Sequence, residues 1–537
     1  MSAQSTAISS FQVFPARPPA HPVIRPLSIL DTSCSDFFSF SAAKVYSPSP
    51  PHAKDPFEPS LLRTSLAHIL SAYPHFAGKV RLARPDDDGR PYQKRFGRVW
   101  IEYGKESDPG VALIFSEKKV PLETCLPKQL GEGLFDATSL NEADVYPETG
   151  SVVQVRPTPT EGPALAIRVT RFSDGGVVLA FQIVHTLADA STLNRFAADW
   201  GDVHRALLVS GSTEGIFLPS RPFDPEALDS HAAGDLDASF PDSRIEEEYR
   251  RIPRTAIDMW ANPEQHPHGA VRSSAPVPEL REQDEASGKE RGKPAPWATW
   301  DMAAPVSLRA VDLSAGDLQR LWRRAQASSV GCEDGEASSS CDPVKLTAHD
   351  ALVGHFWRLS MKARDLPPDT LVSLTPAVGV RTRLDPPLPT ETLGSPFVLL
   401  RSEADYSSLT SPSTGPAVAA SAIRRTINSA TPSNLAALLH HAAHVLDPIR
   451  IWPYFCGDTH TSMSSWIGAG SYTADFGSGA PILAEGVLPA VDNMLLFEDA
   501  VGAASKAGKW HEKGVRVKLA LREDVMEKVL ADPELRG

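Results

Sequence analysis

The most constraining feature of this sequence is a pair of apolar, β-branched runs joined by a short polar turn. The runs PALAIRVTRF (163–172) and VVLAFQIVH (177–185) flank the residues Ser-Asp-Gly-Gly at 173–176. A turn of this composition between two such runs is a strong signal for a β-hairpin. Residues 188–207 then repeat apolar side chains at helical spacing. The sequence therefore predicts a buried hairpin that leads directly into an amphipathic helix.

Strands and helices alternate along the rest of the chain as well. Apolar, β-rich runs predict strands at 97–105, 111–120, 306–313 and 371–380, and a strand-rich C-terminal part from about 465 to 521. Helical periodicity predicts a helix that begins at residue 60 and ends at Pro74, and further helices at 315–326, 347–364, twice within 415–446, and at 522–530. Alternation in both halves indicates an α/β fold with mixed sheets.

The chain is too long for one hydrophobic core. It has 537 residues, whereas a single core rarely grows beyond about 250–300 residues. We therefore expect an N-terminal domain over residues 1–208 and a C-terminal domain over residues 301–537. Between them, residues 209–300 are rich in Pro, Asp, Ser and His. This composition is typical of a long crossover linker that is partly disordered.

Charge and cysteine content exclude several classes of protein. Lys and Arg number 53 against 66 Asp and Glu, a net charge of −13. We expect no nucleic-acid partner, because such proteins need a basic face. The five scattered cysteines favour a reducing compartment over a disulfide framework. Neither an apolar run of about 18 residues nor a signal peptide is recognisable, so we expect a cytoplasmic protein without a membrane segment.

The best candidate for chemistry is the segment His185-Thr186-Leu187-Ala188-Asp189. His185 ends an apolar run, and Asp189 stands where the next helix begins. A neutral imidazole, with an ordinary pKa of about 6.5, accepts a proton from a hydroxyl or amine at neutral pH. The alternative on this short pattern alone is that Asp189 only caps the helix and His185 is a hydrogen-bonded core residue.

Other patterns of catalytic or metal-binding type are weaker. His440, His441 and His444 lie on a predicted helix, but no HExxH glutamate accompanies them, which favours a structural role and no metal site. No GxSxG nucleophile elbow occurs. The glycines around 475–479 lack the strand–turn–helix context of a phosphate loop, so that segment on its own predicts a turn.

Seven segments in a fixed order resemble the BAHD family of acyl-CoA-dependent acyltransferases, which carries HxxxD in mid-chain and DFGWG near the C-terminus. They are LSILD (27–31), LLRTSLAHILSAYPHFAGKV (61–80), HTLAD (185–189), LTAHDALVGHFWR (346–358), VRTRLDPPLP (380–389), SSW (464–466) and DFGSG (475–479). The similarity extends from about residue 10 to about residue 530. The long linker and the DFG-x-G variant are similar to the fungal branch that includes trichothecene acetyltransferases.

Three positions depart from the family pattern. Ala190 replaces the glycine that usually follows the motif's aspartate, and Ser478 replaces the tryptophan of DFGWG. Ser395 follows Gly394 where many members have asparagine. None of these changes removes a catalytic group, so they bear on acceptor choice and on local backbone geometry.

The resemblance implies two similar-sized domains like those of chloramphenicol acetyltransferase, with a solvent channel between them. His185 would be the general base that deprotonates a hydroxyl or amine of a small-molecule acceptor, which then attacks the thioester of acyl-CoA directly. The indole N–H of Trp466 and the hydroxyl of Ser464 would stabilise the oxyanion. Acyl-CoA would be a co-substrate, with no permanently bound cofactor and no metal.

The same resemblance assigns supporting roles to five residues. Asp189 would point away from the channel and pair with Arg381, fixing the loop that aims His185. Asp475 and Gly477 would shape a loop near the CoA-binding half. Thr347 would cap the helix that follows it and contact the pantetheine arm.

We expect a monomeric enzyme of secondary metabolism, and two alternatives stay open. A condensation-type or carrier-protein-dependent acyltransferase shares the fold and the histidine, but Val184 and Ala190 replace the first His and the Gly of its HHxxxDG motif. A non-catalytic small-molecule-binding relative would keep the fold without the activity.

Overall fold

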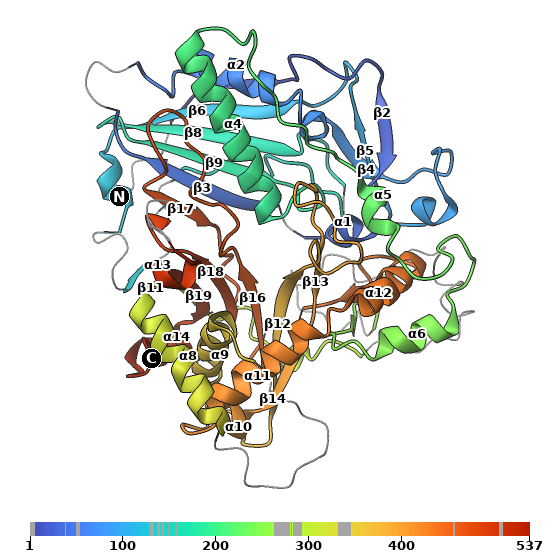
Figure 1. Ribbon diagram of the computed structural model, residues 1–537, viewed down its shortest axis with the longest axis vertical. Helices are drawn as coiled ribbons and strands as arrows, with labels where there is room; N and C mark the ends of the chain where they lie inside the picture. The colour runs from blue at the N-terminus through green and yellow to red at the C-terminus, as the bar shows by residue number, and fades with distance from the viewer. Residues whose placement is uncertain are drawn as a thin grey trace.

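Two mixed β-sheets organise the chain, one in each half of the molecule (Figure 1). The coordinates are a computed structural model. It describes residues 6–37, 39–49, 54–127, 134–136, 140, 144–148, 150–156, 159–261, 280, 282, 293–330, 345–454, 457–503 and 508–537. The α/β class with mixed sheets that the sequence predicts is confirmed.

The N-terminal sheet has six strands, ordered β1-β6-β8-β9-β3-β17. Their bounds are β1 Thr6–Val13, β6 Val111–Lys118, β8 Leu165–Phe172, β9 Val177–Ile183, β3 Phe40–Tyr46 and β17 Leu483–Gly486. Strands β6 and β8 are parallel, and all other neighbours in this sheet are antiparallel. The predicted hairpin is β8–β9, closed by a 2.9 Å hydrogen bond from Phe172 N–H to Gly176 O.

Helices α2 (Pro59–Ile69) and α4 (Ala190–Ser210) lie together over one face of this sheet (Figure 1). The apolar stripe of α4 is buried as expected, with Phe196 and Trp200 fully shielded from solvent. Helix α2 ends at Ile69, a few residues before the predicted end at Pro74. Proline cannot continue an α-helix, and Pro74 instead begins the 3₁₀ turn η1 (Pro74–Ala77).

A small antiparallel sheet, β2-β5-β4, stands beside the N-terminal sheet. Its strands are β2 Val23–Pro26, β5 Val99–Tyr103 and β4 Lys79–Leu82. The predicted strands at 97–105 and 111–120 are therefore both present, as β5 and β6.

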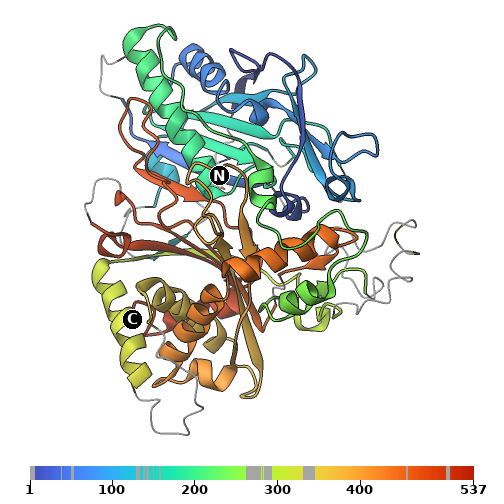
Figure 2. The same cartoon turned by 45° about the vertical axis from the view of Figure 1, so that its right-hand side comes forward.

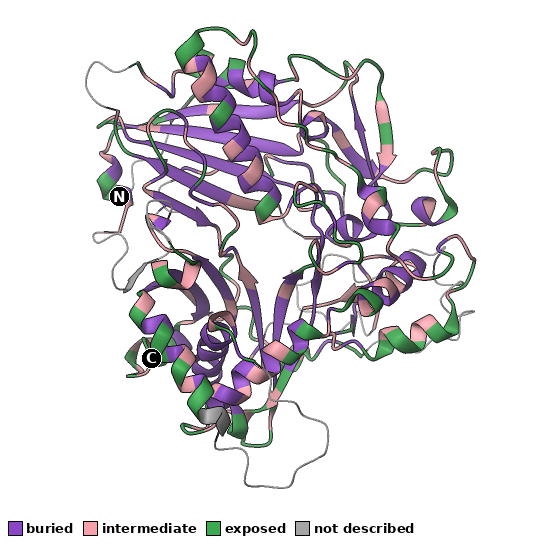
Figure 3. Ribbon diagram, in the orientation of Figure 1, coloured by how far each residue is buried: buried purple, intermediate pink, exposed green. Residues whose placement is uncertain are grey.

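The C-terminal sheet has the order β13-β12-β16-β18-β19-β11-β7, with β14 also paired to β12. Bounds are β13 Phe397–Leu399, β12 Leu371–Gly379, β16 His460–Ser465, β18 Met494–Asp499, β19 Val515–Arg522, β11 Val306–Leu313, β7 Leu134–Asp136 and β14 Ser402–Asp405. Strands β12, β16 and β18 are parallel, and the remaining pairs are antiparallel. The strands of both sheets are largely buried (Figure 3).

The C-terminal half has helices at the positions that the periodicity predicts: α8 Ala315–Val330, α9 Ala348–Lys362, α11 Gly415–Asn428, α12 Pro432–His444 and α14 Glu523–Ala531. Two short helices, α10 Tyr406–Thr410 and α13 Trp510–Lys513, were not predicted. Helices α8, α9 and α11 contact one another. Among the described residues, no helix is long and apolar enough to cross a membrane.

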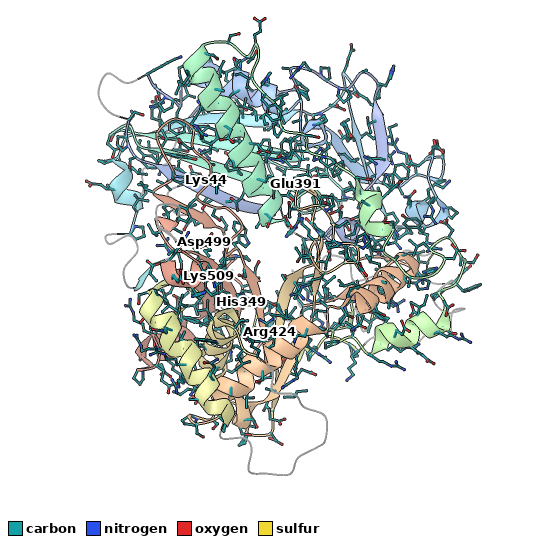
Figure 4. All side chains as sticks on the ribbon, in the orientation of Figure 1. Lys44, His349, Glu391, Arg424, Asp499 and Lys509 are labelled. Atoms are coloured by element: carbon teal, nitrogen blue, oxygen red, sulfur yellow. The ribbon has the colours of Figure 1, made fainter. Side chains whose placement is uncertain are left out.

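The two halves exchange strands. β17 comes from the C-terminal part of the chain but pairs with β3 in the N-terminal sheet, while β7 comes from the N-terminal part and pairs with β11. Lys44 on β3, labelled in Figure 4, is buried, and its Nζ donates to Asn194 Oδ1 at 2.9 Å and to Ser471 O at 2.6 Å. The halves are therefore joined by backbone pairing as well as by side chains.

The crossover at 209–300 contains regular structure. It forms α5 (Pro225–Asp229), α6 (Ser243–Arg250) and β10 (Ile257–Asp258). Helix α6 packs on α12, and β10 pairs with β15 (Ile451–Trp452). From this part of the chain, residues 262–279, 281 and 283–292 lie outside the described residues, so the expected partial disorder stays a prediction there. Figure 1 shows α5 and α6 at the right-hand side of the molecule, the side that Figure 2 turns forward.

Candidate active site

His185 lies two residues beyond β9, in the short loop before α4, and it meets the C-terminal half there. Its Nδ1 is 3.3 Å from the hydroxyl of Ser395, and that hydroxyl donates to the His185 carbonyl at 2.5 Å. Ser395 belongs to the segment just before β13. The histidine thus lies between a strand end of one domain and a loop of the other. The family resemblance implies such a position between the domains.

A backbone bridge joins the two loops. Ala188 forms a parallel β-bridge with Gly394, and the Asp189 N–H donates to Gly394 O at 3.1 Å. The Thr192 hydroxyl donates to the same carbonyl at 2.9 Å. The Gly394–Ser395 segment, called the 394 loop below, is therefore fixed to the HTLAD segment at several points.

Asp189 both caps α4 and forms an ion pair with Arg381. Its Oδ1 accepts from Thr192 N–H at 2.8 Å and caps α4. Its carboxylate also receives two bonds from the Arg381 guanidinium, at 2.5 and 3.2 Å. Arg381 also donates to the carbonyl oxygen of Gly394, in the 394 loop, and to that of Thr392, two residues before it. The predicted ion pair is present, and it spans the two halves.

Aromatic rings surround the imidazole of His185. Ring centroids lie at 5.6 Å for Phe37, 4.9 Å for Phe40 and 5.4 Å for Phe397. Phe37 also contacts Trp452 and Tyr454. Burial among these rings lowers the pKa of His185, while a hydrogen bond to its own backbone and the charge of Asp189 oppose that shift. The imidazole is therefore neutral at neutral pH and able to accept a proton.

Trp466 and Ser464 stand one ring away from His185. Trp466 makes an edge contact with Phe40 at 5.9 Å, and its six-membered ring lies close to Gly486, where an added Cβ would be 2.7 Å from it. Trp466 directly follows β16, and because side chains alternate along an extended chain, we expect Ser464, two positions earlier, on the same side as Trp466. Among the described residues, neither the Trp466 indole N–H nor the Ser464 hydroxyl has a hydrogen-bond partner. Both are thus available as donors.

Thr347 caps α9 as predicted. Its hydroxyl accepts from Asp350 N–H, and Asp350 Oδ2 accepts from the Thr347 backbone N–H at 2.7 Å, which forms a capping box. The Thr347 hydroxyl also donates to Asp350 Oδ2 at 2.7 Å. Arg424 on α11 donates to the same hydroxyl at 2.9 Å and to both oxygens of Asp350. His349 and Arg424 lie near each other in Figure 4. A serine-type hydroxyl has one proton and two lone pairs, so that of Thr347 is already saturated.

The DFGSG loop contacts the N-terminal half and lies apart from His185. Asp475 Oδ1 accepts from the N–H groups of Gly477 and Gly479, at 2.7 and 3.0 Å. Its backbone carbonyl accepts from Arg205 on α4, and Gly201 lies so close that a Cβ would be 2.6 Å from that carbonyl. Gly477 has φ +103, a conformation that favours glycine. The loop therefore packs against α4.

The three histidines of α12 make structural hydrogen bonds. His440 binds the backbone at Ala233 and Asp242, His441 pairs with Glu246, and His444 bonds to the carbonyl of His440. No group of three or more metal-ligating side chains occurs within the part of the chain that the structure describes.

Sequence reasoning missed several residues that shape this site. The aromatic shell comes from three separate segments, and Asp31, in α1 (Ile29–Ser33), binds the 394 loop through a 2.6 Å hydrogen bond from Ser395 N–H. The LSILD and Gly394-Ser395 segments both stand out in the sequence, but no local pattern links residues more than 360 positions apart.

Comparison with known proteins adds independent information. The family model described as Transferase family matches residues 134–536. Acyltransferase AFT15-1 of Alternaria alternata is 23% identical over 88% of this chain and 86% of its own length. Acyltransferase abl6 of Leptosphaeria maculans is 22% identical, over 88% and 87%.

Solved structures share the fold. That of F. graminearum TRI101 complexed with ethyl coenzyme A has a TM-score of 0.60 at 14% identity, covering 96% of this chain and 98% of its own. Vinorine synthase gives 0.56 at 16% identity, covering 98% and 96%. The predicted two-domain α/β architecture is confirmed by these likenesses.

Proposed function

The chain belongs to the Transferase family, the BAHD acyltransferases, and from this membership we propose that it moves an acyl group from a coenzyme A thioester to a hydroxyl or amine of a small molecule. The observation that carries the proposal is the position of the His185 imidazole at the junction of the two halves, 3.3 Å from the Ser395 hydroxyl and in the loop that the Asp189–Arg381 pair fixes.

His185 acts as the general base. It takes the proton of the acceptor hydroxyl or amine while the acceptor oxygen or nitrogen attacks the thioester carbonyl carbon. The tetrahedral intermediate then collapses, the carbon–sulfur bond breaks, and the proton on His185 passes to the CoA thiolate. No acyl-enzyme forms, in agreement with the lack of a Ser or Cys nucleophile motif in the sequence.

The oxyanion of this intermediate needs preorganised donors. Among the described residues, the Trp466 indole N–H and the Ser464 hydroxyl are two donors without a hydrogen-bond partner; the Phe40 ring lies between Trp466 and His185, and Ser464 is two positions before Trp466. We assign them this role. Removing one such donor typically costs about 10²–10³ in kcat.

The supporting residues divide into two groups. Asp189 and Arg381 keep the His185 loop in place, and Asp475 and Gly477 shape a loop against α4. The Thr347 hydroxyl already makes three hydrogen bonds, two with Asp350 and one with Arg424. A contact between this hydroxyl and the pantetheine arm would therefore have to displace the Arg424 guanidinium.

The aromatic shell bears on the acceptor. Two half-buried rings, Phe37 and Phe397, contact His185 directly. Two more half-buried rings, Trp452 and Tyr454, contact Phe37. Such a wall favours an acceptor with an apolar body that carries one reactive hydroxyl or amine. TRI101, whose fold this chain shares, has been solved with coenzyme A and T-2. We place this chain in the fungal branch, as a monomeric cytoplasmic enzyme of secondary metabolism without a permanent cofactor.

A panel of acyl-CoA donors against apolar alcohols and amines tests the proposal. Wild type should release free CoA thiol in the presence of an accepted alcohol or amine, with an acylated product of matching mass, and His185→Ala should not. Thiol release that requires a carrier-protein thioester instead of acyl-CoA would favour the condensation-type alternative, although Val184 and Ala190 do not match that motif. Ligand binding without any turnover would favour a non-catalytic relative.

A further inference from the structure

The helices of the C-terminal half enclose a small cavity that lies outside the candidate active site. Helices α8, α9 and α11 contact one another there (Figure 1). The cavity has a volume of about 10 Å³, and its lining includes Leu321 on α8, Ala351 and Arg358 on α9, and Pro416 on α11. A cavity of this size holds one particle about as large as a water molecule.

Arg358 brings an incompletely paired guanidinium to this cavity. Its side chain is 1% exposed, and its Nη1 donates to Glu534 Oε2. Its Nε and Nη2 are buried and have no hydrogen-bond partner among the described residues. Buried donors without an acceptor are costly, above all on a charged group. These two nitrogens therefore indicate an acceptor that the described part of the chain does not supply.

The N-terminal turn of α11 lies against the same guanidinium. A Cβ on Gly415, the first residue of this helix, would be 3.0 Å from Arg358 Nε, and Pro416 lines the cavity. Thr414 at the N-cap makes no side-chain hydrogen bond to the first turn. The positive end of the helix dipole is therefore not offset by a capping side chain, and it favours negative charge nearby.

The ionisable groups around the cavity leave Nε and Nη2 of Arg358 without a carboxylate. Arg324 on α8 also donates to Glu534, so the two guanidiniums share this one carboxylate. Burial acts to raise the pKa of Glu534, but the hydrogen bonds from both arginines hold it at about 2. His355 is neutral, because burial lowers its pKa to about 4, and its Nε2 lies 3.3 Å from Leu535 O.

We propose that this cavity binds a small monovalent anion, chloride, between the Arg358 guanidinium and the first turn of α11. A chloride ion accepts from Nε–H and Nη2–H together, and hydrogen bonds between charged partners are the stronger ones. The small volume excludes sulfate, phosphate and organic carboxylates, and the positive surroundings favour an anion over water. The ion stabilises the packing of α8, α9 and α11 and takes no part in acyl transfer.

Thermal unfolding in two salts measures this binding. An ion that binds only the folded protein raises the melting temperature as its concentration increases. In sodium chloride the melting temperature should exceed that in sodium gluconate at equal ionic strength, because gluconate is too large for the cavity and both salts screen surface charges alike. A crystal soaked in sodium bromide should show an anomalous peak beside Nε and Nη2 of Arg358.

Three variants locate the effect. Arg358→Lys keeps a cation that can pair with Glu534 but removes Nε and Nη2, so the difference between the two salts should disappear. Arg323→Lys makes the same exchange at an exposed position of α8 and should keep the difference. Ala351→Val adds two methyl groups at the wall of the cavity and should abolish the difference by filling the space. If Arg358→Lys does not fold, Ala351→Val decides.

Equal melting temperatures of wild type in chloride and gluconate would overturn the inference, and so would a bromide-soaked crystal without a peak in the cavity. A chloride effect that persists in Arg358→Lys or in Ala351→Val would also overturn it, because the ion would then bind elsewhere. None of these experiments measures acyl transfer, so their outcome does not depend on the proposed function.

Discussion

The pair between Asp189 and Arg381 allows a quantitative test, because its two functions can be removed separately. Asp189→Asn keeps the cap of α4, since asparagine caps as well as aspartate, but removes the charge that receives the bonds at 2.5 and 3.2 Å. The side chains of Asp189 and Arg381 are 17% and 15% exposed. Breaking a buried pair costs about 3–5 kcal/mol and an exposed pair about 0–1, so about 2 kcal/mol is expected here.

The assay is thermal unfolding of wild type and four variants. Asp189→Asn and Arg381→Met should each lower the melting temperature by roughly 2–4 °C, and the double mutant should lose little more than either single one, because both remove the same pair. Asp189→Ala should lose about 1 kcal/mol more than Asp189→Asn, which is the cap. Melting of Asp189→Asn at the wild-type temperature, with additive losses in the double mutant, would refute the anchoring role.

Four further outcomes follow from the geometry of the site. His185→Ala should fold normally and lose about 10²–10⁴ in turnover; near-wild-type turnover would contradict its role as base. Since burial lowers the pKa of His185 and its neutral form is active, the rate should be flat around neutral pH and fall only below the ordinary histidine pKa of about 6.5, as a pH–rate profile would show. Trp466→Phe keeps the ring and removes the indole N–H, so kcat should drop by about 10²–10³ with KM preserved, and equal kcat would exclude it as a donor. Gly486→Ala brings a Cβ within 2.7 Å of the Trp466 ring and should lower kcat by displacing it, whereas an unaffected kcat would show that the ring position does not matter.

Local patterns were sufficient for much of this fold. The β8–β9 hairpin, the helix α4 with its Asp189 cap, and the helix α9 with its Thr347 capping box each depend on residues within a few positions of one another, and the structure has all three. The proline that was expected to end helix α2 begins a 3₁₀ turn at Pro74, and α2 itself ends a few residues earlier, at Ile69.

Parts of the site depend on contacts that no periodicity records. His185 and Asp189 stand in one motif, and the pairing of Asp189 with Arg381 was expected only through the family resemblance. Ser395 and Asp31 are assembled by tertiary packing across the two halves. The aromatic shell likewise combines Phe37, Phe397 and Trp452 from distant segments. Side chains that meet only in the folded state leave no spacing rule in the sequence.

The insertion of β17 into the N-terminal sheet has a consequence for synthesis on the ribosome. The N-terminal sheet cannot be completed until Leu483–Gly486 emerge, long after the hairpin ends at Ile183. At about 5–20 residues per second, β3 remains an open edge for tens of seconds. Lys44 lies in the middle of that edge, opposite Ala484 in the finished fold. A charged lysine on an unpaired strand opposes pairing with other nascent chains. The edge that carries Lys44 is covered only when β17 has been synthesised and pairs with β3.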